Sequence, residues 1–258
     1  MDSERSQPLI GPDDPPPVRV TNPGGRSSFL LIGDHAGRAI PARLGSLGLG
    51  QADLARHIAC DIGVAGLGRR LAGELNACFI EQVYSRLVID CNRPEGHGEA
   101  FVEESDGTVI TGNGSLDARA RAERRAAIAT PYQAAIAAEL ARRDAQGTAT
   151  VLVALHSFTP VMQGVARPWD IGVLHDGGDT GFARALLARL RGAGGVVVGD
   201  NEPYRMDATD HSVPLHAYAA RRPYAELEVR QDHLSDAAGQ SLWAARLAAA
   251  LQGALADG

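Results

Sequence analysis

The chain has 258 residues, 45% of them hydrophobic and 22% charged, and these shares are ordinary for a globular protein with one large core. The formal net charge of −6 argues against a nucleic acid or a membrane surface as partner, because both require clustered cations. The three cysteines lack CxxC spacing, which argues against a disulfide framework and against a zinc knuckle.

The opening segment, residues 1–19, contains acidic residues and a run of three prolines, and we expect it to be flexible. It lacks a basic start followed by an apolar block, and no apolar run approaches the roughly 20 residues that span a bilayer. These features predict a cytoplasmic protein. No linker divides the remainder, so we expect a single domain over residues 20–258.

Short apolar runs alternate with helix-like stretches along the first half of this domain. The pattern predicts a strand over 28–33, a helix over 51–76 with a break near 61–63, and paired strands over 77–80 and 86–90. Residues 94–115 are rich in Gly, Asp and Asn and predict a long loop. Loops of that length inside a compact domain are usually functional.

The second half continues the alternation. It predicts a helix over 116–146 with a new start at Thr130-Pro131, strands over 148–155, 169–174, 195–198 and 225–229, and helices over 180–191 and 239–255. The unbroken apolar run at 148–155 is typical of a strand covered on both sheet faces. We therefore expect an α/β domain with a mixed, mainly parallel sheet and helices on both faces.

Polar residues follow or lie within several of these strands. Asp34-His35 follows the first strand, His156-Ser157 follows the strand over 148–155, and Glu228 lies within the last strand. The carboxyl ends of strands in open α/β sheets form the ligand crevice. Two neutral imidazoles with a carboxylate and a water would suit a divalent metal. A histidine at a strand end is equally compatible with a hydrogen-bonded structural role.

A second polar group surrounds the strand expected at 86–90. The guanidinium groups of Arg86 and Arg93 match a carboxylate in bidentate geometry, and the Asn92 amide would complete such a clamp. The alternative is that Asp90 pairs with one of these arginines at the surface, where an ion pair contributes little stability.

Six strings in order along the chain resemble the N-formylglutamate amidohydrolase family. They are DHAGRAIP (34–41), DIG (61–63), YSRLVIDCNR (84–93), LHSFTP (155–160), GDNEPY (199–204) and LEVRQD (227–232). The resemblance covers residues 20–251. The SRLVIDCNR and GDNEPY strings are specific, whereas a bare His-Ala-Gly is not.

The resemblance implies a three-layer fold similar to that of zinc carboxypeptidases and aspartoacylase. It also implies a role for individual residues: metal ligands His35 and His156, carbonyl polariser Arg86, substrate-carboxylate clamp Asn92 and Arg93, and general base Glu228. A second carboxylate on the substrate would need a further cation, for which Arg230 and Arg205 are the candidates.

The chain departs from the zinc carboxypeptidases at one position. Those enzymes use a His-x-x-Glu pair, but the residue three after His35 is Arg38, which cannot bind a metal. We expect Asp61 to be the third ligand, because it lies in a matched string at the expected start of a helix. The alternative role for Asp61 is an N-cap of that helix.

The function implied is hydrolysis of N-formyl-L-glutamate to formate and glutamate by an enzyme that uses Zn²⁺ or another divalent metal, as in histidine degradation. One alternative is a deacylase of another N-acyl amino acid. Another is a non-catalytic binder of acidic metabolites that holds no metal. The sequence leaves the identity of the metal and the oligomeric state open.

Overall fold

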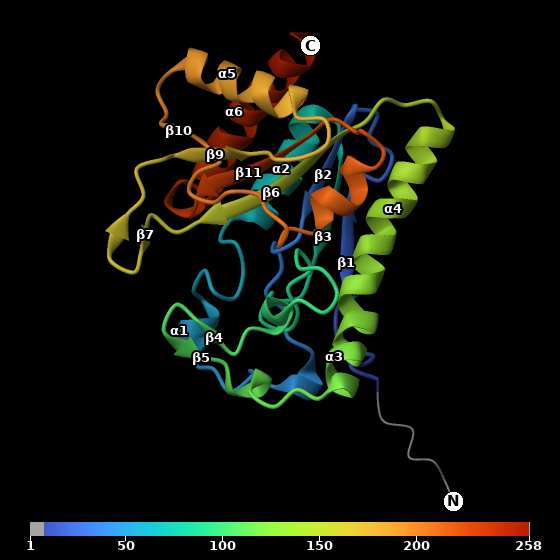
Figure 1. Ribbon diagram of the computed structural model, residues 1–258, viewed down its shortest axis with the longest axis vertical. Coiled ribbons are helices and arrows are strands. Elements are labelled where there is room, and N and C mark those ends of the chain that lie inside the picture. Colours follow the sequence, from blue (N-terminus) through green and yellow to red (C-terminus); the bar gives the residue numbers. More distant parts are fainter. Residues whose placement is uncertain (1–7, 258) are drawn as a thin grey trace, which may run out of the picture.

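A seven-stranded mixed sheet with the strand order β1-β3-β2-β6-β11-β9-β10 organises the computed structural model, which describes residues 8–257 (Figure 1). The strands are β1 (Val18–Thr21), β2 (Phe29–Gly33), β3 (Cys78–Gln82), β6 (Val151–Phe158), β9 (Ile171–Leu174), β10 (Val198–Asp200) and β11 (Tyr224–Arg230). The central strands β3, β2, β6 and β11 are mutually parallel, whereas β1 and the pair β9–β10 run antiparallel to them.

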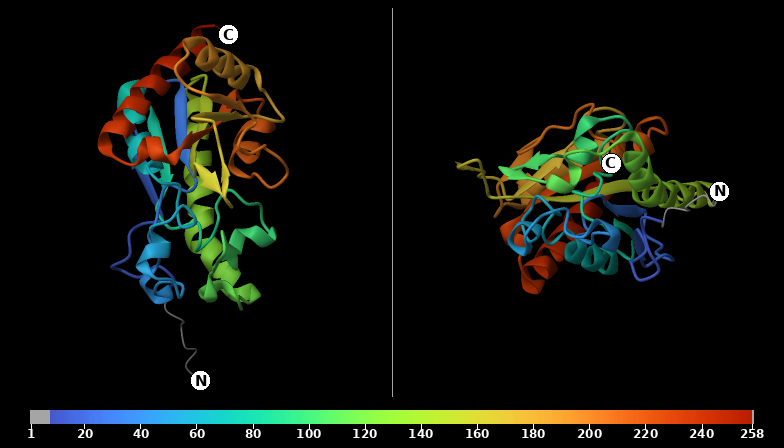
Figure 2. Two further views of the ribbon diagram at one scale, coloured as in Figure 1. Left: turned by 90° about the vertical axis from the view of Figure 1, so that its left-hand side faces the viewer. Right: turned by 90° about the horizontal axis from the view of Figure 1, so that it is seen from below.

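Helices cover both faces of this sheet, as Figures 1 and 2 show. The helices are α1 (Gln51–Leu54), α2 (Val64–Leu75), α3 (Ala118–Arg124), α4 (Thr130–Ala145), α5 (Gly181–Ala193) and α6 (Ala237–Ala256). α2, α5 and α6 pack together on one face, and α4 lies on the other face against β1 and β3. The expected three-layer α/β architecture with a mixed, mainly parallel sheet is therefore confirmed.

The alternation of side chains along β2 and β6 divides the core between the two faces. Leu31 and Val153 belong to the cluster under α2, α5 and α6, whereas Leu30 and Leu152 belong to the cluster under α4. Successive residues of a strand point to opposite faces, so a strand covered on both sides must be apolar at every position. This explains why these strands read as unbroken apolar runs.

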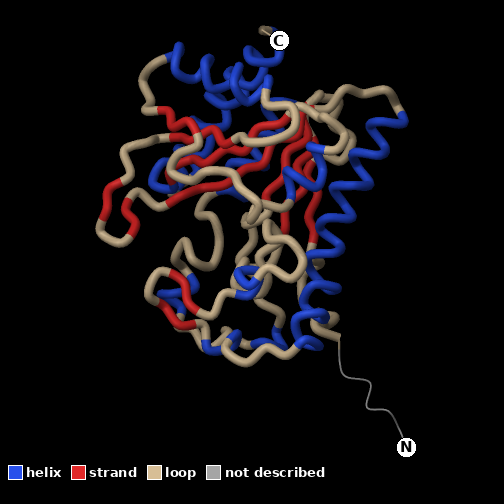
Figure 3. The backbone as a smooth tube through the Cα atoms, viewed as in Figure 1, coloured by secondary structure: helices blue, strands red, loops and turns tan. Residues whose placement is uncertain are grey.

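Loops and short elements fill the region beyond the carboxyl ends of the central strands (Figure 3). They include the hairpins β4 (Glu104–Ser105)–β5 (Thr108–Val109) and β7 (Val161–Met162)–β8 (Val165–Ala166) and the 3-10 turns Ala42–Leu44, Gly98–Phe101, Thr111–Asn113 and Gln231–Leu234. The segment 94–115, expected to be a loop, thus contains one hairpin and two of the turns. It forms part of the wall of the cavity described below.

Several sequence expectations about elements were wrong. The helix expected over 51–76 with a break near 61–63 is helical only in α1 and α2, and residues 55–63 between them are not. Residues 86–90 form a turn rather than a strand, with Leu87, Val88 and Ile89 at most 1% exposed. An apolar run indicates that a segment is buried but does not identify its secondary structure. Here the run is buried because it belongs to the hydrophobic cluster that α4 covers. The strand expected at 148–155 extends over β6, so His156 lies within the strand. No break occurs at Thr130, because the π-helical segment Arg125–Ala129 joins α3 to α4.

The structure describes part of the opening segment, residues 1–19, which the sequence predicts to be flexible. Residues 1–7 lie outside the described residues. From Pro8 onward the segment packs on the domain: Leu9 is 2% exposed, and the Pro15 carbonyl accepts a hydrogen bond of 2.6 Å from the Tyr84 hydroxyl. β1 then adds an antiparallel edge strand that the sequence analysis did not foresee. Among residues 8–257, none of the helices combines the length and apolarity that crossing a bilayer requires.

Candidate active site

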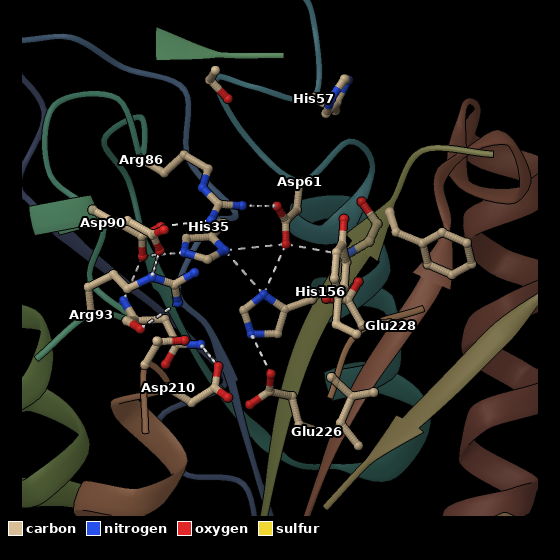
Figure 4. Close-up of a pocket in the computed structure, with 18 of the residues that line it drawn as sticks. His35, His57, Asp61, Arg86, Asp90, Arg93, His156, Asp210, Glu226 and Glu228 are labelled. Atoms are coloured by element: carbon tan, nitrogen blue, oxygen red, sulfur yellow. Dashed lines mark hydrogen bonds and ion pairs between the residues drawn. The ribbon is translucent and has the colours of Figure 1, made fainter. Parts of the chain in front are cut away.

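A cavity of about 370 Å³ lies at the carboxyl ends of β2, β6 and β11 (Figure 4). Its lining includes eight of the nine residues singled out from the sequence: His35, Asp61, Arg86, Asn92, Arg93, His156, Arg205 and Glu228. These residues come from segments far apart in the sequence. Parallel strands end at the same edge of a sheet, which is why the segments meet there.

His35, Asp61 and His156 converge at the floor of this cavity, each at most 4% exposed. His156 Nδ1 lies 3.2 Å from His35 Nδ1 and 3.0 Å from Asp61 Oδ2, and His35 Nδ1 lies 3.5 Å from that same oxygen. Ligand atoms placed tetrahedrally around an ion at zinc–nitrogen distances are about 3.3 Å apart. The three atoms therefore fit three corners of a zinc-type coordination sphere.

The position of Asp61 distinguishes between its two expected roles. The residue that caps α2 is Gly63, and no side chain caps this helix. The Asp61 backbone N–H donates to the His35 carbonyl at 2.9 Å, and its Oδ2 accepts the backbone N–H of Ser157 at 3.2 Å. The side chain thus faces the two histidines rather than the start of the helix.

A buried carboxylate lies behind each histidine. His35 Nε2 is 2.7 Å from Asp90 Oδ1, and His156 Nε2 is 3.4 Å from Asp34 Oδ2. Both rings consequently turn Nδ1 toward the centre, the arrangement by which outer carboxylates orient imidazole ligands. Asp90 is 4% exposed, so the surface ion pair with an arginine that the sequence suggested is a buried contact instead. Asp90 Oδ1 also accepts the backbone N–H of Asn92 at 2.9 Å. The place of Asp90 two residues before Asn92 was the one sign in the sequence that it belongs to the site.

Arg86 bridges the carboxylates of the floor. Its Nη2 lies 2.7 Å from Asp90 Oδ2 and its Nη1 3.3 Å from Asp61 Oδ1, while the side chain is still 28% exposed. Burial opposes ionisation of these acids, but the charges of His35 and Arg86 hold the pKa of Asp90 well below its usual range. Arg86 is thus a fixed cation whose outer side borders the cavity.

Glu228 lines the cavity from β11, in register with His156 on β6. It is 7% exposed, and its Oε2 has no hydrogen-bond partner among the described residues. Burial raises the pKa of Glu228 to about 8, and the neighbouring charge of Asp61 adds to this effect. A buried carboxylate with a free oxygen and a raised pKa can take up a proton near neutral pH.

Glu226 is a second buried carboxylate that the sequence analysis missed. It precedes Glu228 by two residues on β11, so both side chains point to the same face of the sheet, which was a readable signal. Glu226 is 3% exposed, and its Oε1 lies 4.0 Å from His156 Nε2. Burial raises the pKa of Glu226 to about 8.

The two members of the expected carboxylate clamp both line the cavity but have different partners. The Asn92 side chain is 3% exposed, and its Oδ1 accepts the N–H groups of His211 and Ser212, each at 2.9 Å. Its amide nitrogen donates to Asp210 at 3.3 Å. Asn92 therefore holds the segment 210–212 in place. Arg93 also lines the cavity, with its Nε 3.2 Å from the exposed carboxylate of Glu99.

The two candidates for the second cation lie in different places. Arg205 lines the cavity and is exposed, and its side chain makes no ion pair or hydrogen bond with residues 8–257. Arg230 is absent from the cavity lining and pairs instead with Asp232 at 2.8 Å and Asp170 at 3.2 Å. The structure thus brings Arg205, but not Arg230, to the site.

Gly172 on β9 sets the position of the loop that carries Tyr204 and Arg205. It lies in register with Glu228, and a Cβ built at this position would be 1.9 Å from the carbonyl oxygen of Glu202. The loop backbone therefore rests directly on the strand. Only glycine permits so close an approach here.

Comparison with known proteins relates the chain to one family. The sequence profile of N-formylglutamate amidohydrolase matches residues 27–235. A crystal structure of the gene product Atu2144 from Agrobacterium tumefaciens is 34% identical, covers 96% of this chain and 98% of its own, and superposes with a TM-score of 0.93. N-formylglutamate amidohydrolase from Ralstonia eutropha JMP134 is 18% identical over 92% of this chain and 98% of its own, with a TM-score of 0.69. No curated protein matched significantly.

Proposed function

Because the chain belongs to the N-formylglutamate amidohydrolase family, whose members hydrolyse amide bonds, we propose that it cleaves N-formyl-L-glutamate to formate and glutamate. We further propose that His35, Asp61 and His156 hold a divalent cation, with zinc as the first choice. The observation that carries the proposal is the convergence of these three ligand atoms beside Arg86 and Glu228 in one cavity. A histidine-degradation pathway and a cytoplasmic location stay predictions.

The residues around the proposed cation divide the chemistry of amide hydrolysis among them. When bound, a divalent cation would lower the pKa of a water molecule and polarise the substrate carbonyl. Glu228 accepts the proton of the attacking water through its free oxygen and then delivers it to the leaving nitrogen. Arg86 faces the oxygen on which negative charge develops, and one such donor typically contributes about 3 kcal/mol.

The substrate is held by the cations of the cavity wall. Arg93 binds the α-carboxylate, which competes successfully with Glu99 because that partner is 62% exposed and only weakly attracts the guanidinium. Arg205, which has no partner in the described part of the chain, is available for the side-chain carboxylate. Two fixed contacts of this kind convert binding energy into orientation of the scissile bond.

The direct test is a hydrolysis screen of N-formyl, N-acetyl and N-succinyl derivatives of glutamate and aspartate, with metal content measured in parallel. We expect N-formyl-L-glutamate to be the best substrate, activity to disappear on chelation, and zinc to restore it. A preference for a larger acyl group would support the deacylase alternative. A protein that purifies without metal and hydrolyses none of these compounds would support the non-catalytic binder.

A further inference from the structure

Arg167 lies outside the cavity lining but stacks on two residues that belong to it, Phe158 and Tyr204. It follows β8, and its backbone N–H donates to the Pro160 carbonyl at 2.8 Å, which closes the β7–β8 hairpin. Met162 of this hairpin lines the cavity, as do Phe158 and Tyr204, whose rings contact the arginine. The Arg167 side chain is half-buried at this position.

Aromatic groups, rather than acids, hold the guanidinium of Arg167. Its Cζ lies 4.8 Å from the ring centroid of Tyr204 and 5.9 Å from that of Phe158, and its Nη1 donates to the Tyr204 hydroxyl at 2.9 Å. Stacking on aromatic rings fixes the plane of a guanidinium without neutralising its charge. This charge acts on Glu228 and on His57, two other residues that line the cavity.

The other arginines near the cavity are in a different situation. Arg86 binds Asp61 and Asp90, and Arg93 binds Glu99, so part of their charge is already compensated. Within residues 8–257, Arg167 forms no ion pair with a carboxylate, and neither does Arg205, the residue next to Tyr204. Two guanidinium groups without a carboxylate partner in the described part of the chain therefore adjoin Tyr204: Arg167 stacks on its ring, and Arg205 follows it in the chain.

We propose that Arg167 is a specificity-determining residue that, together with Arg205, recognises the side-chain carboxylate of a dicarboxylic N-acyl amino acid. This inference rests on the proposed function, since it names the part of the substrate that these two arginines select. A guanidinium held in a fixed plane offers two parallel N–H groups to a carboxylate. A carboxamide of the same shape has only one oxygen to accept these N–H groups, because its nitrogen is itself a donor. Arg167 therefore selects a side-chain carboxylate over the corresponding amide.

The matched substrates are N-formyl-L-glutamate and N-formyl-L-glutamine, which differ only in that side-chain group. Arg167→Ala should lower kcat/KM for the glutamate derivative by about 10- to 100-fold, in line with the loss of charged hydrogen bonds, and leave that for the glutamine derivative nearly unchanged. Tyr204→Phe should have a smaller effect in the same direction, because the ring still supports the guanidinium. Arg189→Ala, which removes an exposed guanidinium of α5 that pairs with Asp257 away from the cavity lining, is the control.

Two outcomes separate this inference from the proposed function. Suppose that the wild-type enzyme hydrolyses N-formyl-L-glutamate and that Arg167→Ala lowers kcat/KM for both substrates equally, or for neither. The inference is then overturned while the function stands. If the wild type hydrolyses neither substrate, calorimetric binding of L-glutamate and L-glutamine decides. Loss of the preference for glutamate in Arg167→Ala supports the inference, and an unchanged preference overturns it.

Discussion

The floor and the rim of the cavity are built in opposite ways. The floor, which comprises His35, Asp61, Arg86, Asp90 and His156, is a closed network in which every side chain contacts at least one other member. The rim, which comprises Arg93, Glu99, Arg167, Tyr204 and Arg205, has few internal contacts and greater exposure. We infer that the floor fixes the chemistry, whereas the rim determines which substrate is accepted.

The largest effect should come from Glu228, which adjoins the floor. Glu228→Gln should lower kcat by about 100- to 10,000-fold, the range for loss of a general base, while the bound metal stays. Because burial raises the pKa of Glu228 to about 8, kcat/KM of the wild type should rise with pH until this group ionises. The steady-state rates and the metal content of both proteins check the prediction. A variant with near-normal turnover would remove Glu228 from the mechanism.

A change at the rim should affect binding more than turnover. Arg93→Ala should raise KM by about 10-fold or more with a smaller effect on kcat, because one charged hydrogen-bond partner of the substrate is lost. The matched variant Glu99→Gln frees Arg93 and should leave KM equal or lower. Loss of metal from Arg93→Ala, measured by elemental analysis, would show that the floor and the rim are not independent.

The smallest effect concerns stability rather than activity. The pKa of Glu226 in the folded protein, about 8, lies above its ordinary value, so the folded state binds the extra proton and stability falls as pH rises from about 4.5 to 8. Glu226→Gln abolishes this loss. With a chelator present, the free energy of unfolding of Glu226→Gln minus that of the wild type should be larger at pH 8 than at pH 5. The increase in this difference should be on the order of 1 kcal/mol or more. Urea titrations that give equal differences at both pH values would contradict this.

The sequence predicted the floor better than the rim, for a physical reason. β2 and β6 are buried on both sides, so their apolar runs marked the strands and thereby located His35 and His156 at one edge. Glu226 and Glu228 are two residues apart on one strand, so the sequence already indicated that both side chains point to the same face of the sheet. Only Glu228 was predicted as a site residue.

The rim depends on contacts that no periodicity encodes. Arg205 and Arg230 looked equivalent in the sequence, and they differ in the fold: Arg205 lines the cavity, whereas Arg230 lies outside its lining and pairs with Asp170 and Asp232. Asn92 stays a predicted ligand for the substrate, but nothing in the sequence indicated that its amide also holds residues 210–212. Long-range partners of polar side chains are a property of the tertiary structure, so local strings could not reveal them.

Gly172 has a consequence for how new specificities could arise on this scaffold. The missing methyl group at this crossing lets the Glu202 carbonyl rest against β9. Even alanine there would lift the loop and carry Tyr204 and Arg205 away from the reacting bond. Directed evolution toward other acyl amino acids should therefore accumulate exchanges among the exposed arginines while position 172 stays invariant.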